Sequence, residues 1–396
     1  MSWCLFALLL VAPAAAPYRV AVPGYHFEFP RDNFNHPHYQ TEWWYYTGNL
    51  AAQDGRQFGF ELTFFRIGVS PRKPEGQVWD VRNIYLAHMA VSDLSGHRFY
   101  YRERFNRAGP GLAGTDATRA IVWNGNWSAQ WSGKQQRLRA ITADYAFELA
   151  LTPLKPPVIN GRDGISQKGP ARGEASHYIS LTRLKTAGTL TVRGKTYQVT
   201  GVSWMDHEFF TERRDPSLIG WDWFSVQLNN DTELMLYRLR LTGSRPSPYS
   251  SGTYVDAQGR SHFLSANDFT VWPGATWSSP STRARYPIEW RISVPSLHLD
   301  LRLATPLRDQ ELARRSPASP AYWEGAVRLS GTEAGKKISG AGYLEMTGYA
   351  APLNLNVSTR PSLQRKDLPA KNAVRCVRPA LQRHPPPSRF CRSHSD

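Results

Sequence analysis

Hydrophobic and polar residues alternate with a period of two along most of the chain. In the segment 57–66 every second residue is a large apolar side chain, and in 297–303 leucines alternate with polar residues. Successive side chains of a strand point to opposite faces of a sheet, so both segments are predicted to be half-buried β-strands. Turn sequences such as Asp54-Gly55 separate many of these segments, as hairpin connections do. The pattern predicts an antiparallel all-β protein with few short helices, one of them at 309–315.

The strand-like segments fill more of the chain than one barrel or sandwich needs. About 330 residues are enough for two up-and-down antiparallel barrels or sandwiches. We place these two units at 18–200 and 201–351. No proline- or serine-rich linker marks this boundary, and the strand-like segment 201–210 lies directly at it. The 396 residues are 41% hydrophobic and 12% aromatic, which is enough to build two cores.

The two ends of the chain differ in composition from the rest. Residues 1–16 hold an apolar stretch followed by three alanines, which predicts a signal peptide and a secreted or periplasmic location. The alternative is a buried N-terminal helix. Residues 352–396 hold seven prolines and nine Lys or Arg against two acids, which predicts a disordered basic tail. Such a tail could also make peripheral contact with an anionic membrane surface.

Charge and cysteine usage exclude several function classes. The formal net charge is +16, but the tail carries +7 of it, and the remaining basic residues are scattered beside acids. We therefore expect no nucleic-acid partner. The three cysteines, Cys4, Cys376 and Cys391, all lie in the two ends. The body thus contains no thiol nucleophile, disulfide or Cys-ligated zinc site.

Motifs of common enzyme classes are incomplete. The segment 188–196 has five residues between its glycines where a phosphate-binding loop has four. His207-Glu208 is followed by Thr211 in the place of the second histidine of a zinc-protease motif, and no G-x-S-x-G elbow occurs. His36 and His38 are possible metal ligands, but no third ligand follows at a recognisable spacing. We therefore expect a loop there, and no metal.

The strand-like segment 201–210 carries unusual polar groups. Trp204, Asp206 and Glu208 share one face, and His207 lies on the other. Carboxylates among large apolar groups are costly to bury unless they are paired or protonated. Asp206 therefore has two interpretations. It either forms a salt bridge with an arginine, or it lies in an apolar cavity with a raised pKa and acts as a proton donor.

Aromatic residues cluster around two further strand-like segments, 42–46 and 221–224. In the first, aromatics occupy both faces, which indicates either a strand covered on both sides or the wall of a ligand cavity. The alternative is packing between the two units. In a third segment, 173–181, His177 and Tyr178 point to opposite faces, and a lone strand histidine is often structural.

Nine segments in order resemble one family, among them TEWWYYTGNL, FGFELTFFR, ASHYISLTRL, GVSWMDHEFF and GWDWFSVQL. The chain resembles the carotenoid 1,2-hydratase (hydroxyneurosporene synthase) and AttH-like family over about residues 18–351, and particularly its branch of secreted predicted hydrolases. The resemblance implies two lipocalin-like (calycin-type) antiparallel β-barrels packed together. In the hydratase branch, water is added across a terminal isoprenoid double bond without a redox cofactor. The matching catalytic positions in this chain are Asp206, His177 and Trp204.

We therefore expect a hydratase- or hydrolase-like enzyme that uses general acid catalysis, without a cofactor, on an apolar isoprenoid or lipid-like substrate. Asp206 would donate the proton, Trp204 would stabilise a developing cation, and His177 would orient or activate water. The aromatic pocket between the barrels is expected to include Glu42, Trp43, Trp44, Tyr46, Tyr178, His207, Glu208, Trp221 and Trp223. Two alternatives remain, namely a non-catalytic carrier of a hydrophobic ligand and a cofactor-free cyclase or isomerase.

Overall fold

The computed structural model describes residues 17–69, 81–211, 215–313 and 321–352. Almost all of their regular structure is β-strand, and the helices among them are single 3-10 turns, η1 (Arg31–Asn33), η2 (Thr242–Ser244) and η3 (Pro295–Leu297). None of these described helices could cross a bilayer. The expected signal peptide and, from residue 353 onward, the expected tail lie outside the described residues.

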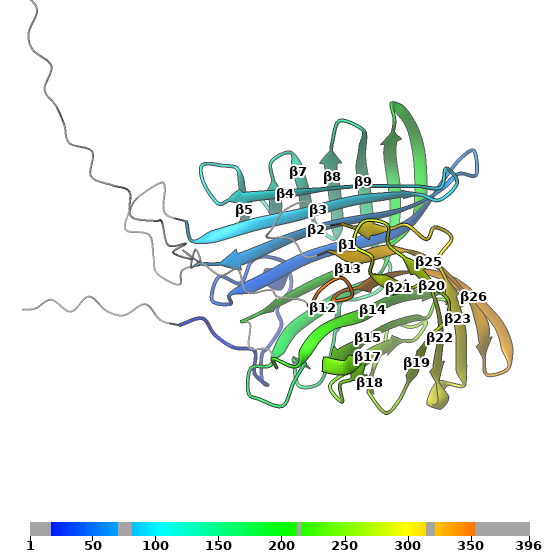
Figure 1. Cartoon of the computed structure of the whole chain (residues 1–396). Coiled ribbons are helices and arrows are strands. Elements are labelled where there is room, and N and C mark those ends of the chain that lie inside the picture. The colour runs from blue at the N-terminus through cyan, green and yellow to red at the C-terminus, as the bar shows by residue number, and fades with distance from the viewer. Residues whose placement is uncertain (1–16, 70–80, 212–214, 314–320, 353–396) are drawn as a thin grey trace, which may run out of the picture. The chain divides into compact units, whose positions relative to one another are not determined.

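The first sheet is formed by the N-terminal part of the described chain, and its hydrogen-bonded neighbours are antiparallel (Figure 1). Two short strands, β10 (Val158–Ile159) and β11 (Ser166–Gln167), pair with β12 (Ala175–Val192) beside the main order. Across the sheet the main order is β4 (Arg98–Arg107), β3 (Asn83–Asp93), β2 (Gln57–Gly68), β1 (Thr41–Ala52), β13 (Lys195–Phe210), β12 (Ala175–Val192), β9 (Tyr145–Pro153), β8 (Gln135–Ile141), β7 (Trp127–Ser132), β6 (Ile121–Asn124) and β5 (Ala113–Asp116).

The second sheet is formed by the C-terminal part. Its order is β18 (Ser261–Ser265), β17 (Ser251–Val255), β15 (Glu233–Leu241), β14 (Leu218–Leu228), β26 (Lys336–Met346), β25 (Tyr322–Glu333), β23 (Leu299–Ala304), β22 (Glu289–Val294) and β19 (Thr270–Pro273). Strand β16 (Arg245–Pro246) pairs with β15, and β24 (Glu311–Leu312) pairs with β25. A separate hairpin joins β20 (Thr276–Ser278) to β21 (Arg285–Pro287). The helix expected at 309–315 is therefore wrong in its described part, which contains β24.

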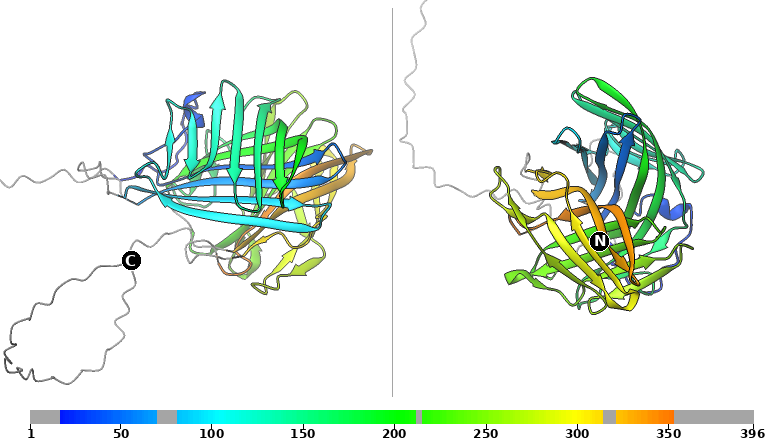
Figure 2. Two further views of the ribbon diagram at one scale, coloured as in Figure 1. Left: turned by 90° about the horizontal axis from the view of Figure 1, so that it is seen from above. Right: turned by 90° about the vertical axis from the view of Figure 1, so that its right-hand side faces the viewer.

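Both sheets are strongly curved, as Figure 2 shows. The edge strands β4 and β5 of the first sheet come into contact, so this sheet is nearly a closed barrel, whereas the second sheet forms a half-barrel. Each sheet encloses its own apolar core, and a third, largely aromatic cluster lies between them. The expected all-β pair of lipocalin-like barrels is confirmed.

The chain changes from the first sheet to the second between Phe210 and Leu218. The boundary expected after residue 200 falls inside β13, because this long strand pairs with β1 and β12 almost to its end. The sequence 201–210 therefore belongs wholly to the first sheet. All described residues belong to one compact unit.

The strands differ in how many of their faces are covered. Along β7 and β8 exposed and buried residues alternate, because one face of these strands meets solvent. Along β1 nearly every residue is buried, because one face lines the first barrel and the other packs on the second sheet. Strands β2 and β25 approach so closely that a Cβ on Gly59 would lie 2.9 Å from Cβ of Ala326. Chemistry placed on this side of the first barrel is therefore enclosed.

Candidate functional site

Asp206 lies in β13 on the face that turns toward the second sheet. It is 3% exposed and accepts hydrogen bonds from three neutral donors. The Tyr178 hydroxyl donates to Oδ2 at 2.6 Å, while the Ser180 hydroxyl and the Trp204 indole N–H donate to Oδ1 at 2.5 and 2.7 Å. Among the described residues, none forms an ion pair with Asp206. The interpretation of Asp206 as the partner of an arginine is therefore not supported.

The electrostatics of this position favour a proton-bearing acid. Burial raises the pKa of Asp206 to about 7, since the hydrogen bonds from Ser180, Tyr178 and Trp204 offset only part of the desolvation and Glu208 adds a repulsion. Because Oδ1 already accepts two hydrogen bonds, the proton of the neutral form lies between Oδ2 and the Tyr178 oxygen. A large share of Asp206 is thus protonated near neutral pH.

Aromatic side chains from both sheets surround this acid. The Trp223 indole N–H, from β14, donates to the Tyr178 hydroxyl at 2.9 Å. The Trp223 ring makes edge contacts with Trp204 and Tyr45, at centroid distances of 6.3 and 5.2 Å. Two expected contributors, Trp43 and Trp221, are partly buried against the same cluster. The structure therefore brings together Asp206, Trp43, Tyr178, Trp204, Trp221 and Trp223.

The remaining expected residues, apart from Glu208, lie on the opposite faces of the same strands. Trp44 and Tyr46 belong to the core of the first barrel. His177 pairs with Phe209 across β12 and β13, whereas Ser180 pairs with Asp206, so His177 points away from the acid. Its Nε2 meets the Tyr39 hydroxyl at 3.1 Å and its Nδ1 meets the Gly164 carbonyl at 2.8 Å. Burial lowers the pKa of His177 to about 4.

Glu42 and His207 share that inner face with His36. Oε1 of Glu42 lies 2.7 Å from Nδ1 of His36 and 2.9 Å from Nε2 of His207, and its Oε2 accepts from Nε of Arg66 at 2.9 Å. Burial by itself would raise the pKa of Glu42, but Arg66 and the two histidines outweigh it and hold the pKa well below its usual range. Glu42 is therefore ionised.

A second group of acids, the buried Glu61 and Glu324 and the half-buried Glu345, lies between the sheets, and the sequence analysis missed it. Burial raises the pKa of Glu61 and of Glu345 to about 8, and that of Glu324 well above its usual range. The Tyr45 hydroxyl donates to Glu324. Oε2 of Glu61 and Oε2 of Glu324 have no hydrogen-bond partner among the described residues. These acids come from β2, β25 and β26, so no local motif could have revealed them.

Glu208 lies on the Asp206 face and connects it to a pocket. The Glu208 carboxylate accepts from Ser176 and pairs with Nζ of Lys168 at 3.4 Å. That Nζ also lies 3.7 Å from the ring centre of Tyr237. The Tyr237 hydroxyl is hydrogen bonded to Ser251, which lines the pocket. The side chains of Tyr237 and Lys168 thus lie between this pocket and Glu208.

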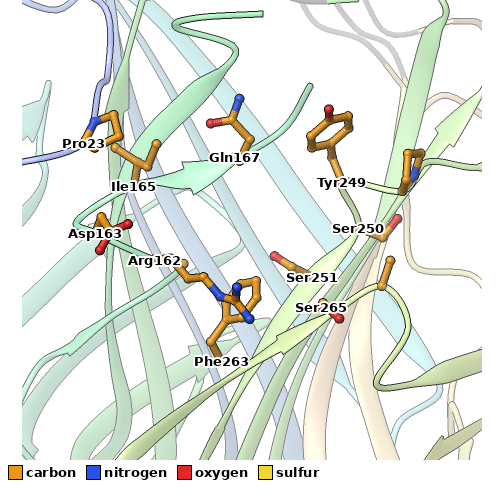
Figure 3. Close-up of a pocket in the computed structure, with 13 residues that line it drawn as sticks. Pro23, Arg162, Asp163, Ile165, Gln167, Tyr249, Ser250, Ser251, Phe263 and Ser265 are labelled. Atoms are coloured by element: carbon orange, nitrogen blue, oxygen red, sulfur yellow. The ribbon is translucent and has the colours of Figure 1, made fainter. Parts of the chain in front are cut away.

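The pocket has a volume of about 200 Å³ and opens between the segment 161–167 and strands β17 and β18 (Figure 3). Arg162, Gln167, Tyr249, Ser251 and Phe263 are among its lining residues. The guanidinium of Arg162 stacks over the Phe263 ring at 4.5 Å. The lining does not include Asp206 or the aromatic residues around it, so this pocket differs from the aromatic chamber expected from the sequence.

Comparisons with known proteins agree on a family. The model of the AttH-like family matches residues 20–349. A crystal structure of an AttH protein from Nitrosomonas europaea is 32% identical, with a TM-score of 0.75, and the match covers 84% of this chain and 99% of that one.

Two curated fungal relatives match less closely. Kievitone hydratase of Fusarium solani subsp. phaseoli is 22% identical over 216 residues, which are 54% of this chain and 59% of that enzyme, so the match spans less than two thirds of its length. The dehydratase asqC of Emericella nidulans is 21% identical over 278 residues, 67% of this chain and 77% of that one. The crystal structure of kievitone hydratase from Nectria haematococca has the same fold, with a TM-score of 0.64 at 17% identity over 85% of this chain and 98% of that one.

Proposed function

Because this chain belongs to the AttH-like family, we propose that it is a lyase-type enzyme that adds water to, or removes water from, an apolar substrate by general acid catalysis. The names of two relatives, a hydratase and a dehydratase, support the reaction class. The observation that carries the proposal is the Asp206 carboxyl, buried among aromatic rings, with a pKa of about 7. The substrate class that fits this setting is isoprenoid or lipid-like.

In this proposal the proton moves along the hydrogen bonds around Asp206. The Tyr178 oxygen accepts the Trp223 N–H and, in the neutral form of the acid, the proton on Oδ2 of Asp206. Its own O–H is then free to donate to a substrate carbon or leaving hydroxyl. When Tyr178 gives that proton away, it takes the proton of Asp206. The resulting Asp206 carboxylate keeps the hydrogen bonds from Ser180 and Trp204, which stabilise its charge.

The surroundings supply the remaining requirements of such a reaction. Protonation of a double bond creates a carbocation, and the faces of Trp204, Trp223 and Tyr45 can stabilise it, each by about 2 kcal/mol in a desolvated site. Water must lose a proton when it attacks. Glu208, two residues along the same strand face as Asp206 and paired with Lys168, is the base that we assign to this step.

The pocket is the route by which the substrate enters in this proposal. Only the side chains of Tyr237 and Lys168 connect it to Glu208 among the contacts described above. Lys168, whose side chain is 24% exposed and pairs with Glu208, moves aside in this proposal when the substrate enters. Narrowing the pocket with Ser265→Trp should therefore raise KM more than it lowers kcat.

The test begins with the ligand. Mass spectrometry of the apolar extract that co-purifies with the full chain identifies candidate substrates, and turnover in H₂¹⁸O then shows whether water is added. We expect Asp206→Asn to lower the rate by about a hundred- to ten-thousand-fold while ligand binding persists. Asp144→Asn, at a side chain 55% exposed, is the matched control.

Four outcomes would reject parts of the proposal. Full turnover by Asp206→Asn would show that Asp206 is not the general acid. An isomerised product without ¹⁸O would indicate a cyclase or isomerase. A retained ligand that the wild-type protein never converts would indicate a carrier, and a fatty ester cleaved with ¹⁸O uptake would indicate a hydrolase.

A further inference from the structure

Three metal-ligating side chains meet on the inner face of the first barrel, and the proposed reaction uses none of them. Nδ1 of His36, Oε1 of Glu42 and Nε2 of His207 all lie within 4.8 Å of one another. We propose that these three atoms bind a divalent transition metal ion, with zinc as the first candidate. Two imidazoles and a carboxylate, with a fourth position left for water, are a ligand set that zinc commonly takes.

In both histidines the ring nitrogen that does not face Glu42 has a hydrogen-bond acceptor, as it has in most metal-binding histidines. Nε2 of His36 lies 3.0 Å from Oδ1 of Asp32, and Nδ1 of His207 lies 3.0 Å from the Asp32 carbonyl oxygen. A metal-ligating histidine nearly always donates its other N–H to a carboxylate or a carbonyl, which fixes its tautomer and ring orientation. Asp32 provides both acceptors and is itself fully buried.

The hydrogen bonds of the two rings do not balance while both imidazoles are neutral. Each ring has an oxygen of Asp32 on one nitrogen and Oε1 of Glu42 on the other. A neutral imidazole has one N–H, so in each ring one lone pair would face an oxygen lone pair. One divalent ion between the inner nitrogens and Oε1 removes both conflicts. It also brings the same charge as the two extra protons that would otherwise be needed.

The nearby guanidinium of Arg66 is compatible with a metal ion. Its Nε donates to Oε2 of Glu42, and its Nη2 donates to the carbonyls of His36 and Tyr39 at 3.0 and 2.8 Å. These bonds anchor Arg66 on Oε2 of the carboxylate. Oε1 accepts the His36 backbone N–H at 3.1 Å, which leaves its other lone pair to the metal. Glu42 would then bind the ion through Oε1 while Arg66 orients it through Oε2.

The site is separate from the proposed general acid. His207 and Asp206 are neighbours in β13 and point to opposite faces. Bonds of about 2.0–2.1 Å in a tetrahedral site place ligand atoms about 3.3 Å apart, so the two nitrogens would each move about half an ångström from Oε1. The His36 side chain is 10% exposed, whereas those of Glu42 and His207 are 0% and 1% exposed, so His36 is the ligand nearest to solvent.

The experiment uses the full chain without an affinity tag, treated with chelator and dialysed. We expect elemental analysis to find about one zinc per chain after reloading, and Co²⁺ to give the visible absorption of a tetrahedral site. His36→Gln and His207→Gln should each weaken Co²⁺ binding at least tenfold. His38→Gln is the matched control, because His38 is exposed two residues away and should leave binding unchanged.

The measurements can also overturn the site. The proposed site is wrong if the folded wild-type protein takes up less than a tenth of an equivalent of zinc or cobalt. It is also wrong if His207→Gln binds metal as tightly as the wild-type protein does. An equal loss with His38→Gln would indicate a surface site instead. If a ligand variant does not fold, the wild-type melting temperature decides: a rise that saturates at one equivalent of Zn²⁺ supports the site, and no rise rejects it.

Discussion

Two buried carboxyl groups on opposite sides of the first barrel wall have opposite protonation. Asp206 and Glu42 are 3% and 0% exposed, and their strands β13 and β1 are direct neighbours. The pKa of Asp206 is raised to about 7, while that of Glu42 is held well below its usual range. Burial opposes ionisation at both positions, so burial cannot explain the difference.

The difference comes from the charge of the hydrogen-bond donors. Asp206 meets only neutral donors, namely Tyr178, Ser180 and Trp204. Glu42 meets the guanidinium of Arg66 and two imidazoles. A full positive charge at hydrogen-bond distance offsets the free-energy cost of removing the carboxylate from water. Neutral donors offset only part of this cost. The face with neutral donors can therefore supply a proton, and the face with cationic donors cannot.

The largest stability effect that we expect comes from removing the ionised carboxylate. Glu42→Gln leaves Arg66 buried without its charge partner, which should lower the free energy of unfolding by about 3–5 kcal/mol. Urea denaturation at pH 7 measures it. Glu148→Gln is the control, since Glu148 pairs with Arg137 on the surface and its side chain is 50% exposed. A loss below about 1 kcal/mol for Glu42→Gln would contradict this account.

The next largest effect concerns the protonated carboxyl and depends on pH. Asp206 titrates near its ordinary pKa of 3.8 when unfolded and near 7 when folded. Between these values the folded form keeps a proton that the unfolded form has released, so raising the pH lowers stability. Asn resembles the neutral form of the acid and does not titrate, so this side chain causes no loss of stability as the pH rises. Asp206→Asn should therefore be as stable as wild type at pH 4 and more stable at pH 8, by at most about 4 kcal/mol.

Thermal unfolding of both proteins across this pH range measures the effect. The stability difference should appear between pH 4 and pH 7 and stay constant above. A difference that is the same at pH 4 and pH 8 would show that Asp206 is ionised in the folded state, and the electrostatic contrast with Glu42 would then be wrong.

A smaller effect should follow from removing one neutral donor. Trp204→Phe deletes the N–H that bonds to Oδ1 of Asp206, at a cost of about 1–3 kcal/mol in stability. Because this hydrogen bond lowers the pKa of Asp206, its loss should move the pKa further upward. Carboxyl ¹³C NMR of Asp206 measures the shift. Trp272→Phe, at an exposed tryptophan, should leave the pKa unchanged.

The smallest effect on catalysis should come from His177, which faces away from Asp206. Gln can donate to the Gly164 carbonyl and meet the Tyr39 hydroxyl in its place, so His177→Gln should cost about 1 kcal/mol in stability. We expect less than a threefold change in the rate of the proposed reaction. A loss as large as that of Asp206→Asn would mean that His177 reaches the substrate by a path that the static structure does not contain.

Much of the fold followed from local pattern. The alternation of apolar residues predicted the strands, their antiparallel arrangement and the two barrels, and the family resemblance is confirmed. The same alternation placed Trp204, Asp206 and Glu208 on one face. The boundary at 200 and the helix at 309–315 did not follow, because strand pairing with distant segments decided both.

The candidate site followed only in part. Asp206 was recognisable because a carboxyl within an apolar strand needs an explanation wherever the strand lies. Ser180 carries no such signal, and it matters only because β12 pairs with β13 in this register. The cluster of His36, Glu42 and His207 was missed for the same reason, since its third member comes from a strand far along the chain.

The sequence by itself determined which residues alternate between faces, since that depends only on the geometry of a single strand. It therefore determined that Asp206 and His207 point in opposite directions. Only the tertiary structure decided which donors each group meets, and hence which carboxyl keeps its proton. The physical reason is that a pKa depends on desolvation and on charges within a few ångströms, and those charges are brought there by strands distant in sequence.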